Sequence, residues 1–379
     1  MMRVVMLRSN PVRPYPRLEK MANCIVGMGN EVTVLAWDRD EKYTPREEIL
    51  HLKNADVKII RVGIKGQFSG GFKKNAIGLV HFEKFIYSWL KKHRKEYDVI
   101  HAYDFDCGYV ASKIAKKYRK KFVYDIADYY VESHGFKGSL LGNILEKKEI
   151  GVINSADATI ICTEERMNQI SKASPKKVVV IHNTPDLELY EDGAERMILH
   201  QSDRLKLVYV GILGTARFID AIAEVVSKRS DCEFHIGGFG GGMEELFKSF
   251  AAKYDNIFFY GRIPYRKTIE LEKECDVMCA LYDPVVPNHR YAAPNKFYEA
   301  LALGKPLIMA KGTGMSQVVR DNQIGEVITY SKSELNEAIN RLIQRRNDAA
   351  RSERMSNLYA TLYSWEIMKE RIEQLYRKL

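Results

Sequence analysis

The sequence has few cysteines and no motif in which cysteines would pair or hold a metal. Its 379 residues include six Cys, at positions 24, 107, 162, 232, 275 and 279, too few and too scattered for a disulfide scaffold. It contains no CxxC motif and no His/Cys cluster with the spacing of a zinc site. These absences exclude a disulfide-rich fold and a structural zinc module, and they predict free thiols.

A long apolar run is also missing. No stretch approaches the roughly 18 apolar residues at which a membrane span is expected. The first residues carry charge too early for a signal peptide. We therefore expect a cytoplasmic protein. With 46% hydrophobic and 11% aromatic residues the chain is not disordered, and its length predicts two domains.

Positive charge is unevenly distributed along the chain. Residues 1–190 contain 32 Lys and Arg against 23 Asp and Glu, so most of the formal net charge of +10 lies in the first half. A basic half favours an anionic partner, and a solvated basic surface explains it equally well. The basic segment 72–95 is interpreted as an amphipathic helix that could rest on anionic lipid headgroups, or as an ordinary surface helix whose aromatic stripe packs on the sheet. Nucleic acid is not indicated, because the cations are not organised with exposed aromatics.

Short β-branched segments alternate with helical segments twice along the chain, which predicts βαβ units and parallel sheets. The predicted strands of the first half are 3–7, 31–36, 57–61, 98–101, 121–125, 158–162 and 178–182. Those of the second half are 205–210, 233–237, 257–260, 276–280, 306–310 and 325–328. We predict two doubly wound α/β domains at 1–190 and 205–360, a linker at 191–204 and a C-terminal helix at 361–379.

The segment 294–310 contains the clearest candidate site. Pro294 suits the first turn of a helix, and Gly304 suits its C-terminal end. The next strand follows directly. This helix therefore begins at the carboxyl edge of the strand before it, where ligands bind in sheets of this kind.

The start of this helix can bind an anion. The backbone N–H groups of Asn295, Lys296 and Phe297 have no partner inside the helix and could hold a phosphate, and Lys296 adds a full positive charge. Glu299 lies one turn further in, and its carboxylate can accept two hydrogen bonds from a diol such as ribose. From spacing alone, a surface Lys/Glu pair is an equal alternative.

The stretch from Glu299 to Pro306 resembles the signature of the large family of retaining glycosyltransferases with the GT-B fold, family four, which reads E-A-x-A-x-G-x-P. Further matches follow the order of that family: GNEVTV at 29–34, DVIH at 98–101, CTE at 162–164, IHNTPD at 181–186, NIFFYG at 256–261 and YSWE at 363–366. Each match is weak alone, but their order and spacing are specific. The resemblance implies two Rossmann-like domains facing across a cleft, with a last helix that packs back on the first domain.

The resemblance also implies a reaction: a sugar moves from a nucleotide-diphosphate sugar, UDP- or GDP-linked, to a hydroxyl acceptor with retention, without a metal or other cofactor. The second domain would bind the donor, and the basic first domain a saccharide or lipid-linked acceptor, in the synthesis of a polysaccharide, glycolipid or glycoconjugate. Lys296 and Arg217 would neutralise the departing diphosphate, and Glu299 would hold the ribose.

Several strand-end residues of the second domain are implied donor contacts: Gly214, Gly238, Arg262, Ile263 and Tyr291. Tyr291 stands eight residues before Glu299, where the family motif E-x7-E has its first Glu, so the donor sugar stays open. The run GGFGGG at 237–242 does not fit G-x-G-x-x-G, which argues against dinucleotide binding.

In the first domain, the resemblance points to two polar residues at strand ends as catalytic candidates. His101 ends the DVIH strand, and Asp128 resembles the acid of the family's D-x-H-D turn. Arg17, Tyr103 and Asp125 lie in similar places. Such positions are more often occupied by ordinary strand-end polar residues than by catalytic groups.

Two other functions share parts of this pattern. A sugar-nucleotide epimerase of the GT-B fold would need acids on both walls of the cleft for proton abstraction. A protein that binds sugar nucleotides or polyanions without turnover would tolerate the change at Tyr291.

Overall fold

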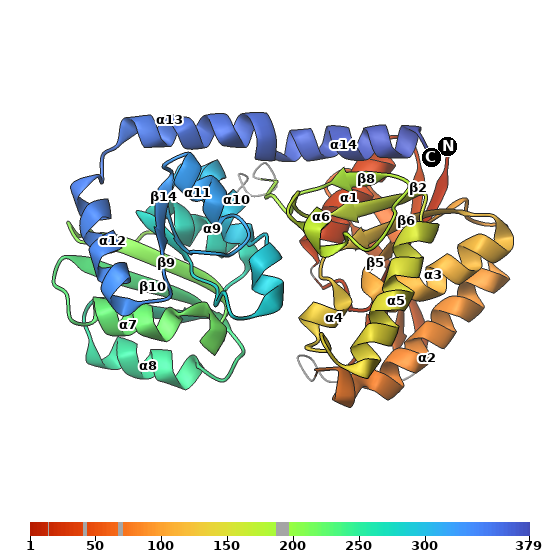
Figure 1. The fold of residues 1–379 in the computed structure, drawn as a ribbon, viewed down its shortest axis with the longest axis horizontal. Coiled ribbons are helices and arrows are strands. Elements are labelled where there is room, and N and C mark those ends of the chain that lie inside the picture. Colours follow the sequence, from red (N-terminus) through yellow and green to blue (C-terminus); the bar gives the residue numbers. More distant parts are fainter. Residues whose placement is uncertain (14, 41–43, 67–70, 187–196) are drawn as a thin grey trace. The chain divides into compact units, whose positions relative to one another are not determined.

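The computed structural model describes residues 1–13, 15–40, 44–66, 71–186 and 197–379 (Figure 1). The chain separates into two units: unit 1 comprises Met1–His182 with Met368–Leu379, and unit 2 comprises Asn183–Ile367. Each unit has its own sheet and its own hydrophobic core. Of the linker predicted at 191–204, residues 191–196 lie outside the described residues.

Unit 1 is built on one sheet with helices on its faces. Its strands are β1 (Arg3–Arg8), β2 (Glu31–Asp38), β3 (Pro45–His51), β4 (Asp56–Gly63), β5 (Val99–Tyr103), β6 (Lys121–Ile126), β7 (Ala158–Ile161) and β8 (Val178–Val180). Its helices are α1 (Pro16–Gly27), α2 (Gly71–Lys92), α3 (Asp104–Tyr118), α4 (Tyr130–Ser133), α5 (Leu140–Ser155) and α6 (Arg166–Gln169).

The strand order of this sheet is β3-β4-β2-β1-β5-β6-β7-β8. All neighbours run parallel except β3, which pairs antiparallel with β4 at the edge. The sequence analysis missed β3, because the segment PREEILH is charged and carries a proline, as edge strands often do. The other predicted strands of this half are confirmed.

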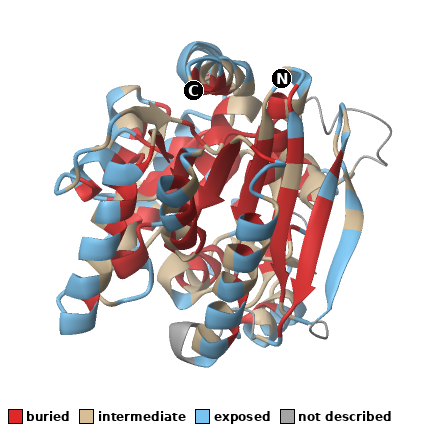
Figure 2. Cartoon of the chain, turned by 90° about the vertical axis from the view of Figure 1, so that its right-hand side faces the viewer, coloured by how far each residue is buried: buried red, intermediate tan, exposed pale blue. Residues whose placement is uncertain are grey.

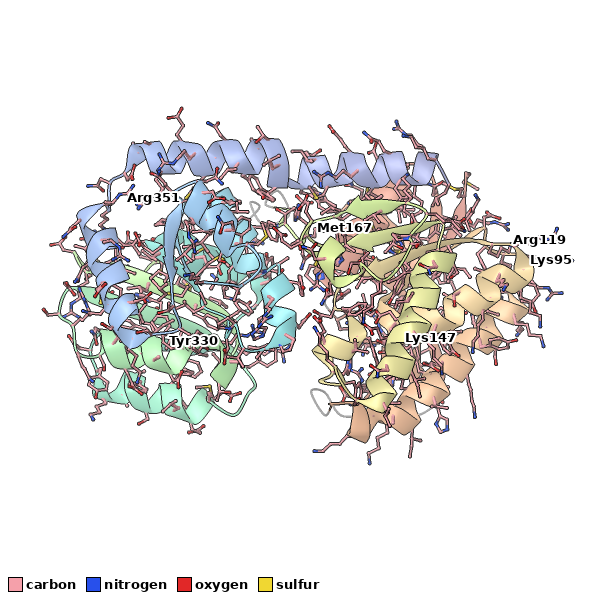
Figure 3. The ribbon with its side chains drawn as sticks, viewed as in Figure 1. Lys95, Arg119, Lys147, Met167, Tyr330 and Arg351 are labelled. Carbon is pink, nitrogen blue, oxygen red and sulfur yellow. The ribbon has the colours of Figure 1, made fainter. Side chains whose placement is uncertain are left out.

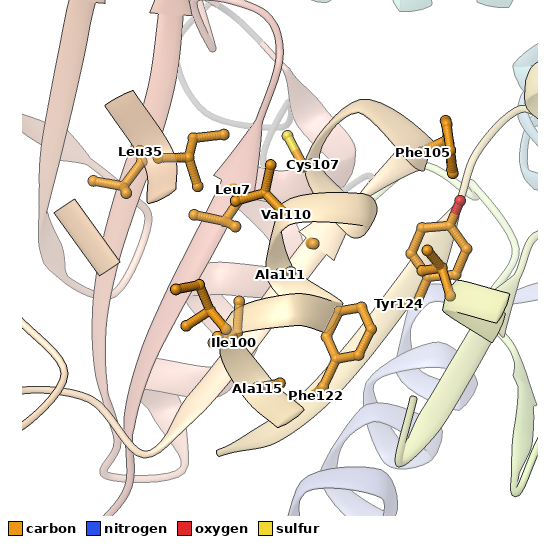
Figure 4. Close-up of a cluster of buried hydrophobic side chains, with 14 of the residues drawn as sticks. Leu7, Leu35, Ile100, Phe105, Cys107, Val110, Ala111, Ala115, Phe122 and Tyr124 are labelled. Carbon is orange, nitrogen blue, oxygen red and sulfur yellow. The ribbon is translucent and has the colours of Figure 1, made fainter. Parts of the chain in front are cut away.

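The core of unit 1 lies between the sheet and helices such as α3. Figure 4 shows Leu7 and Ile100 from neighbouring strands packing against Val110 and Ala111 of α3. The inner strands are largely buried, whereas the edge strand β3 and the outer faces of the helices are exposed (Figure 2). Such continuous burial is typical of a parallel sheet covered on both faces.

The last helix, α14 (Trp365–Arg377), ends in unit 1. Its buried face consists of Met368, Ile372, Leu375 and Tyr376. Arg371 donates to the Val180 carbonyl at 2.9 Å, and the Tyr376 hydroxyl lies 2.7 Å from His101 Nδ1. The end of the chain is thus held to the first sheet by both apolar and polar contacts.

Unit 2 contains a six-stranded parallel sheet. Its strands are β9 (Leu205–Ile212), β10 (Cys232–Phe239), β11 (Ile257–Gly261), β12 (Val277–Ala280), β13 (Leu307–Ala310) and β14 (Gly325–Ile328). Its helices are η2 (Thr215–Arg217), α7 (Ile219–Val226), α8 (Glu244–Lys253), α9 (Tyr265–Glu274), η3 (Pro287–Tyr291), α10 (Asn295–Leu303), α11 (Ser316–Asp321), α12 (Lys332–Gln344), α13 (Ala349–Leu358) and η4 (Tyr359–Tyr363).

The strand order in unit 2 is β11-β10-β9-β12-β13-β14. The chain moves outward in one direction after β9 and in the other after β12, so the connections from these adjacent strands diverge. Such a switch point opens a crevice at the carboxyl ends of the two strands. The predicted fold class, two α/β units with doubly wound sheets, is confirmed, and the switch point in unit 2 is where the predicted donor residues lie.

Candidate functional site

Lys296 reaches the switch point from the first turn of α10. Its side chain is buried, and its ammonium nitrogen lies 4.4 Å from the centre of the Tyr209 ring on β9. A Cβ on Gly211 would stand 3.0 Å from the same nitrogen, so glycine makes room for the lysine at the end of β9. One cation is therefore fixed over the carboxyl end of β9.

This lysine stays charged despite its burial. Burial disfavours the ammonium form, but the Tyr209 and Tyr282 hydroxyls and the Glu299 carboxylate outweigh it and raise the pKa of Lys296 above its ordinary value. A buried ammonium that keeps its proton is a preorganised binding group for a phosphate.

Glu299 lies one turn after Lys296 and is held by α9. The Tyr265 hydroxyl donates to Glu299 Oε1 at 2.6 Å, and the carboxylate is almost fully buried. Glu272, two turns after Tyr265 on the same helix face, is also buried. Neither of its carboxylate oxygens has a hydrogen-bond partner among the described residues. Two acids and one lysine thus share a small buried volume between α9 and α10.

Arg217 supplies a second cation near the switch point. Its guanidinium lies 3.8 Å from the centre of the Tyr282 ring, and Nη1 donates to Nε2 of His289 at 3.2 Å. His289 Nδ1 lies 2.8 Å from the Asp283 carbonyl oxygen, which can only accept. Nδ1 therefore carries the proton and Nε2 is the acceptor, so a neutral His289 orients Arg217.

The glycine-rich run brings the ends of β9 and β10 together. Gly238 has a φ of +147°, and a Cβ there would lie 1.9 Å from the Gly211 carbonyl oxygen. Beside it, the Arg262 guanidinium stacks 4.3 Å from the Phe239 ring, and Ile263 packs against Gly237. The predicted residues Gly238, Arg262 and Ile263 therefore lie along the same edge as Lys296.

The start of α10 differs in part from the prediction. The Phe297 N–H donates to the Pro294 carbonyl at 2.9 Å, and the Phe297 ring is fully buried in the core. The Phe297 N–H is therefore already used within the first turn of the helix, and its contact with a ligand stays a prediction. Asn295 is exposed, and its side-chain oxygen accepts from Asn183 at 2.7 Å. Of the three N–H groups predicted to hold a phosphate, those of Asn295 and Lys296 remain as candidates.

Gly214 and Tyr291 border the same edge. Gly214 precedes η2, and its carbonyl accepts the Arg217 N–H at 3.1 Å. Tyr291 ends η3, directly before the segment that leads into α10, and is partly exposed. The Gly314 N–H donates to the carbonyl of His289, which ties η3 to the loop after β13.

In unit 1 the structure makes His101 a packing residue. Its ring is fully buried, stacks on Tyr103 at 4.8 Å, and contacts the Tyr376 hydroxyl of α14. Its Nε2 faces Asp125 at 3.6 Å, and that carboxylate accepts three hydrogen bonds from Arg17. These contacts enclose the imidazole in the core, and a catalytic role for His101 stays a prediction.

The Asp125 carboxylate is ionised within this core. Burial opposes its charge, but Arg17 and His101 outweigh the burial and lower the pKa of Asp125. Arg17 also donates to the Ile181 carbonyl at 3.0 Å. The pair therefore joins α1, β6 and the segment after β8, so Arg17 and Asp125 stabilise the fold of unit 1.

Asp128 lies at the carboxyl edge of unit 1 and is exposed. Its Oδ1 lies 3.5 Å from Arg166, and its backbone N–H donates to Asp104 Oδ1. Asp104 also pairs with Arg8. Because β1 and β5 are adjacent and their connections diverge, this edge is the switch point of the first sheet. Asp128 is exposed to solvent beside this switch point.

Two searches gave no candidates within the parts of the chain that the structure describes. No group of three or more His, Cys, Asp or Glu side chains could hold a metal ion there. None of the described helices is both long and apolar enough to cross a bilayer.

Comparison with known proteins identifies the family. Residues 17–189 match the family model described as Glycosyltransferase Family 4, and residues 195–357 match the model described as Glycosyl transferases group 1. The fold resembles that of sucrose-phosphate synthase from Thermosynechococcus elongatus, with a TM-score of 0.73 over 100% of this chain and 99% of the other at 15% identity. The chain belongs to the GT-B glycosyltransferases.

This glycosyltransferase is also similar to two further proteins. HepE of Anabaena, solved in complex with UDP-glucose, superposes with a TM-score of 0.69 at 13% identity, over 100% of both chains. The D-inositol 3-phosphate glycosyltransferase of Mycobacterium marinum is 23% identical over 240 residues, which is 60% of this chain. The match spans about half, 51%, of the length of that curated relative. Because the two solved structures are only 13–15% identical to this chain, their similarity shows the fold alone.

Three residues of the glycosyltransferase's candidate site were missed from the sequence. Tyr265 and Glu272 are seven residues apart, which places them on one helix face, and this spacing was the available signal. No local sequence pattern could have identified His289, because its contact with Arg217 joins residues that are 72 positions apart in the chain.

Replacing Glu272 with glutamine is expected to stabilise the protein increasingly as the pH rises. Burial and the negative charge of Glu299 raise the pKa of Glu272 well above its ordinary 4.5, and Lys296 opposes them. A carboxyl group with a raised folded-state pKa loses stability as the pH rises above its unfolded value. Glutamine has no proton to lose, so the difference in unfolding free energy should grow above about pH 4.5.

Urea denaturation across this pH range measures the effect. Glu274→Gln, an exposed position on the same helix, is the matched control and should leave the pH dependence unchanged. Parallel curves for wild type and Glu272→Gln would show that Glu272 ionises normally in the folded protein.

Proposed function

We propose that this protein transfers a sugar from a nucleotide-diphosphate sugar to a hydroxyl acceptor with retention of configuration. The observation that carries the proposal is the group at the switch point of unit 2, where Lys296 lies over the Tyr209 ring, Arg217 over the Tyr282 ring, and Glu299 one turn after Lys296. Two cations beside one buried carboxylate match a ligand with a diphosphate next to a ribose diol. The UDP-glucose complex of HepE supports a uridine nucleotide as the first donor to test.

The chemical task of the site is to stabilise a departing diphosphate. As the bond between the anomeric carbon and the diphosphate oxygen breaks, negative charge grows on that oxygen. The Lys296 ammonium, the Arg217 guanidinium and the free N–H groups at the start of α10 complement that charge without rearranging. The acceptor oxygen forms the new bond on the same face of the sugar, and its proton passes to the leaving diphosphate. No side-chain base is then required.

The acceptor side of the proposal rests on unit 1. Its excess of cations suits an anionic or lipid-linked acceptor, or peripheral contact with an anionic membrane surface. Exposed cations such as Lys95, Arg119 and Lys147 extend from several of its elements (Figure 3). Synthesis of a polysaccharide, glycolipid or glycoconjugate is the expected context.

Thermal unfolding with UDP, GDP, ADP and dTDP tests the donor site. A nucleotide at about 100 times its Kd should stabilise the protein by about 2.7 kcal/mol, or roughly 5–10 °C for a unit of this size. Glu299→Ala should lose most of the shift, measured against its own ligand-free midpoint, because the ribose contact is gone. Glu274→Ala on the neighbouring helix should keep it.

Turnover separates the remaining alternatives. Nucleotide release from the donor only when an acceptor is present would support transfer and argue against an epimerase. Donor binding without turnover across an acceptor panel would favour a binding protein instead. No shift with any nucleotide would overturn the donor-site assignment.

A further inference from the structure

A second candidate site lies in unit 1, away from the switch points described above. A cavity of about 940 Å³ opens between the carboxyl ends of β2 and β4 and the segment 74–84 of α2. Its lining includes Arg39, Lys65, Lys74, Ile77, His81 and Lys84. We call this cavity the basic groove. Its volume is within the range of about 300–1,000 Å³ that is typical of small-ligand sites.

The groove is strongly cationic. Among the described residues of its lining, four are Lys or Arg and Asp40 is the only acid. Within the described part of the chain, Lys65, Lys74 and Lys84 form no ion pair. Positive charges that outnumber the negative charges around one cavity repel one another, so an anion bound there is favoured.

The floor of the groove is rigid. The Arg39 guanidinium stacks 4.4 Å from the Trp37 ring and donates to the Ser9 carbonyl at 2.9 Å, while its Nε is buried with no partner among the described residues. Trp37 in turn donates to the Ile64 carbonyl at 2.8 Å. One cation is therefore already held in place in the lining of the groove.

The wall of the groove combines charge with apolar surface. Lys74, Ile77, His81 and Lys84 lie three or four residues apart, on one face of α2. Ile77 is 77% exposed, although it lies between the two lysines. At Gly78 the helix packs closely on Trp37, which keeps this face in position. An exposed isoleucine among unpaired cations suits a ligand that is anionic at one end and apolar at the other.

We infer that the basic groove binds a phosphate ester that carries an alkyl portion, with Arg39, Lys74 and Lys84 on the phosphate and Ile77 on the alkyl part. The groove lies at the carboxyl edge of the first sheet, so its ligand is the acceptor or its anchor. That identification rests on the proposed function, whereas binding in the groove does not. Two sources offer this chemistry, a lipid within a bilayer and a soluble ester.

Calorimetric titration of the full chain with octyl phosphate and with inorganic phosphate tests the inference. Octyl phosphate should bind more tightly, and the double variant Lys74→Glu/Lys84→Glu should bind it about tenfold more weakly or worse. Lys91→Glu/Lys116→Glu makes the same change in net charge at exposed positions outside the groove, and should bind nearly as wild type. Ile77→Asn should remove the preference for octyl phosphate, whereas Ile49→Asn, also exposed, should not.

Sedimentation with phosphatidylcholine vesicles, with and without phosphatidylglycerol, separates the two sources. Binding to the anionic vesicles that is lost in the groove variant identifies a bilayer lipid. Octyl phosphate binding without vesicle binding identifies a soluble ester. No octyl phosphate binding, or equal losses in both double variants, would overturn the inference. The UDP shift, measured on the same samples, should survive in the groove variant, so failure of the donor site is detected separately.

Discussion

Replacing Lys296 with methionine is expected to lower kcat by about 10²–10³-fold, the usual cost of removing one preorganised charge-stabilising group. The ammonium is buried over the end of β9, 4.4 Å from the Tyr209 ring. Methionine fills nearly the same volume without the charge, so the packing between α10 and β9 is retained. The loss should therefore appear in turnover rather than in folding.

Steady-state kinetics with a UDP-sugar donor measure this effect, together with thermal unfolding of each variant. Lys305→Met, just after the other end of α10, is the control, because Lys305 is half-buried and its replacement removes the same charge. It should keep turnover near the wild-type level. A Lys296→Met enzyme with an unchanged kcat would show that this lysine does not act on the leaving group.

Replacing Gly238 with alanine is expected to destabilise the protein by about 3 kcal/mol or more, from overpacking and backbone strain together. The new Cβ would lie 1.9 Å from the Gly211 carbonyl oxygen, and a φ of +147° is strained for any residue with a side chain. Neither the carbonyl nor the strand end can move without separating β9 from β10. Because Gly211 also makes room for Lys296, nucleotide binding should weaken as well.

Gly214→Ala is the control for this experiment. A Cβ at Gly214 meets nothing within 4 Å, and its φ of −119° is ordinary for alanine. Urea denaturation should place this variant within about 0.5 kcal/mol of wild type. Equal stability of the two variants would contradict the close approach at Gly238.

The local parts of the candidate site could be read from the sequence. Pro294 and Gly304 set the ends of one helix, and the alternating strand pattern placed its start at a strand edge. Lys296 and Glu299 followed from that helix. Spacing did not show that the helix itself uses the Phe297 N–H or that the core encloses the His101 side chain, because both depend on how the elements pack.

The sequence by itself determined the βα alternation, the two sheets and the position of the candidate donor edge, since periodicity and chain-end signals are local properties. The tertiary structure alone decided which side chains meet there. Arg217 is oriented by His289, Glu299 is held by Tyr265, and the basic groove combines two strand ends with one face of α2. Each contact joins segments far apart in the chain, so it depends on strand order and on how closely the elements pack, neither of which a local pattern contains.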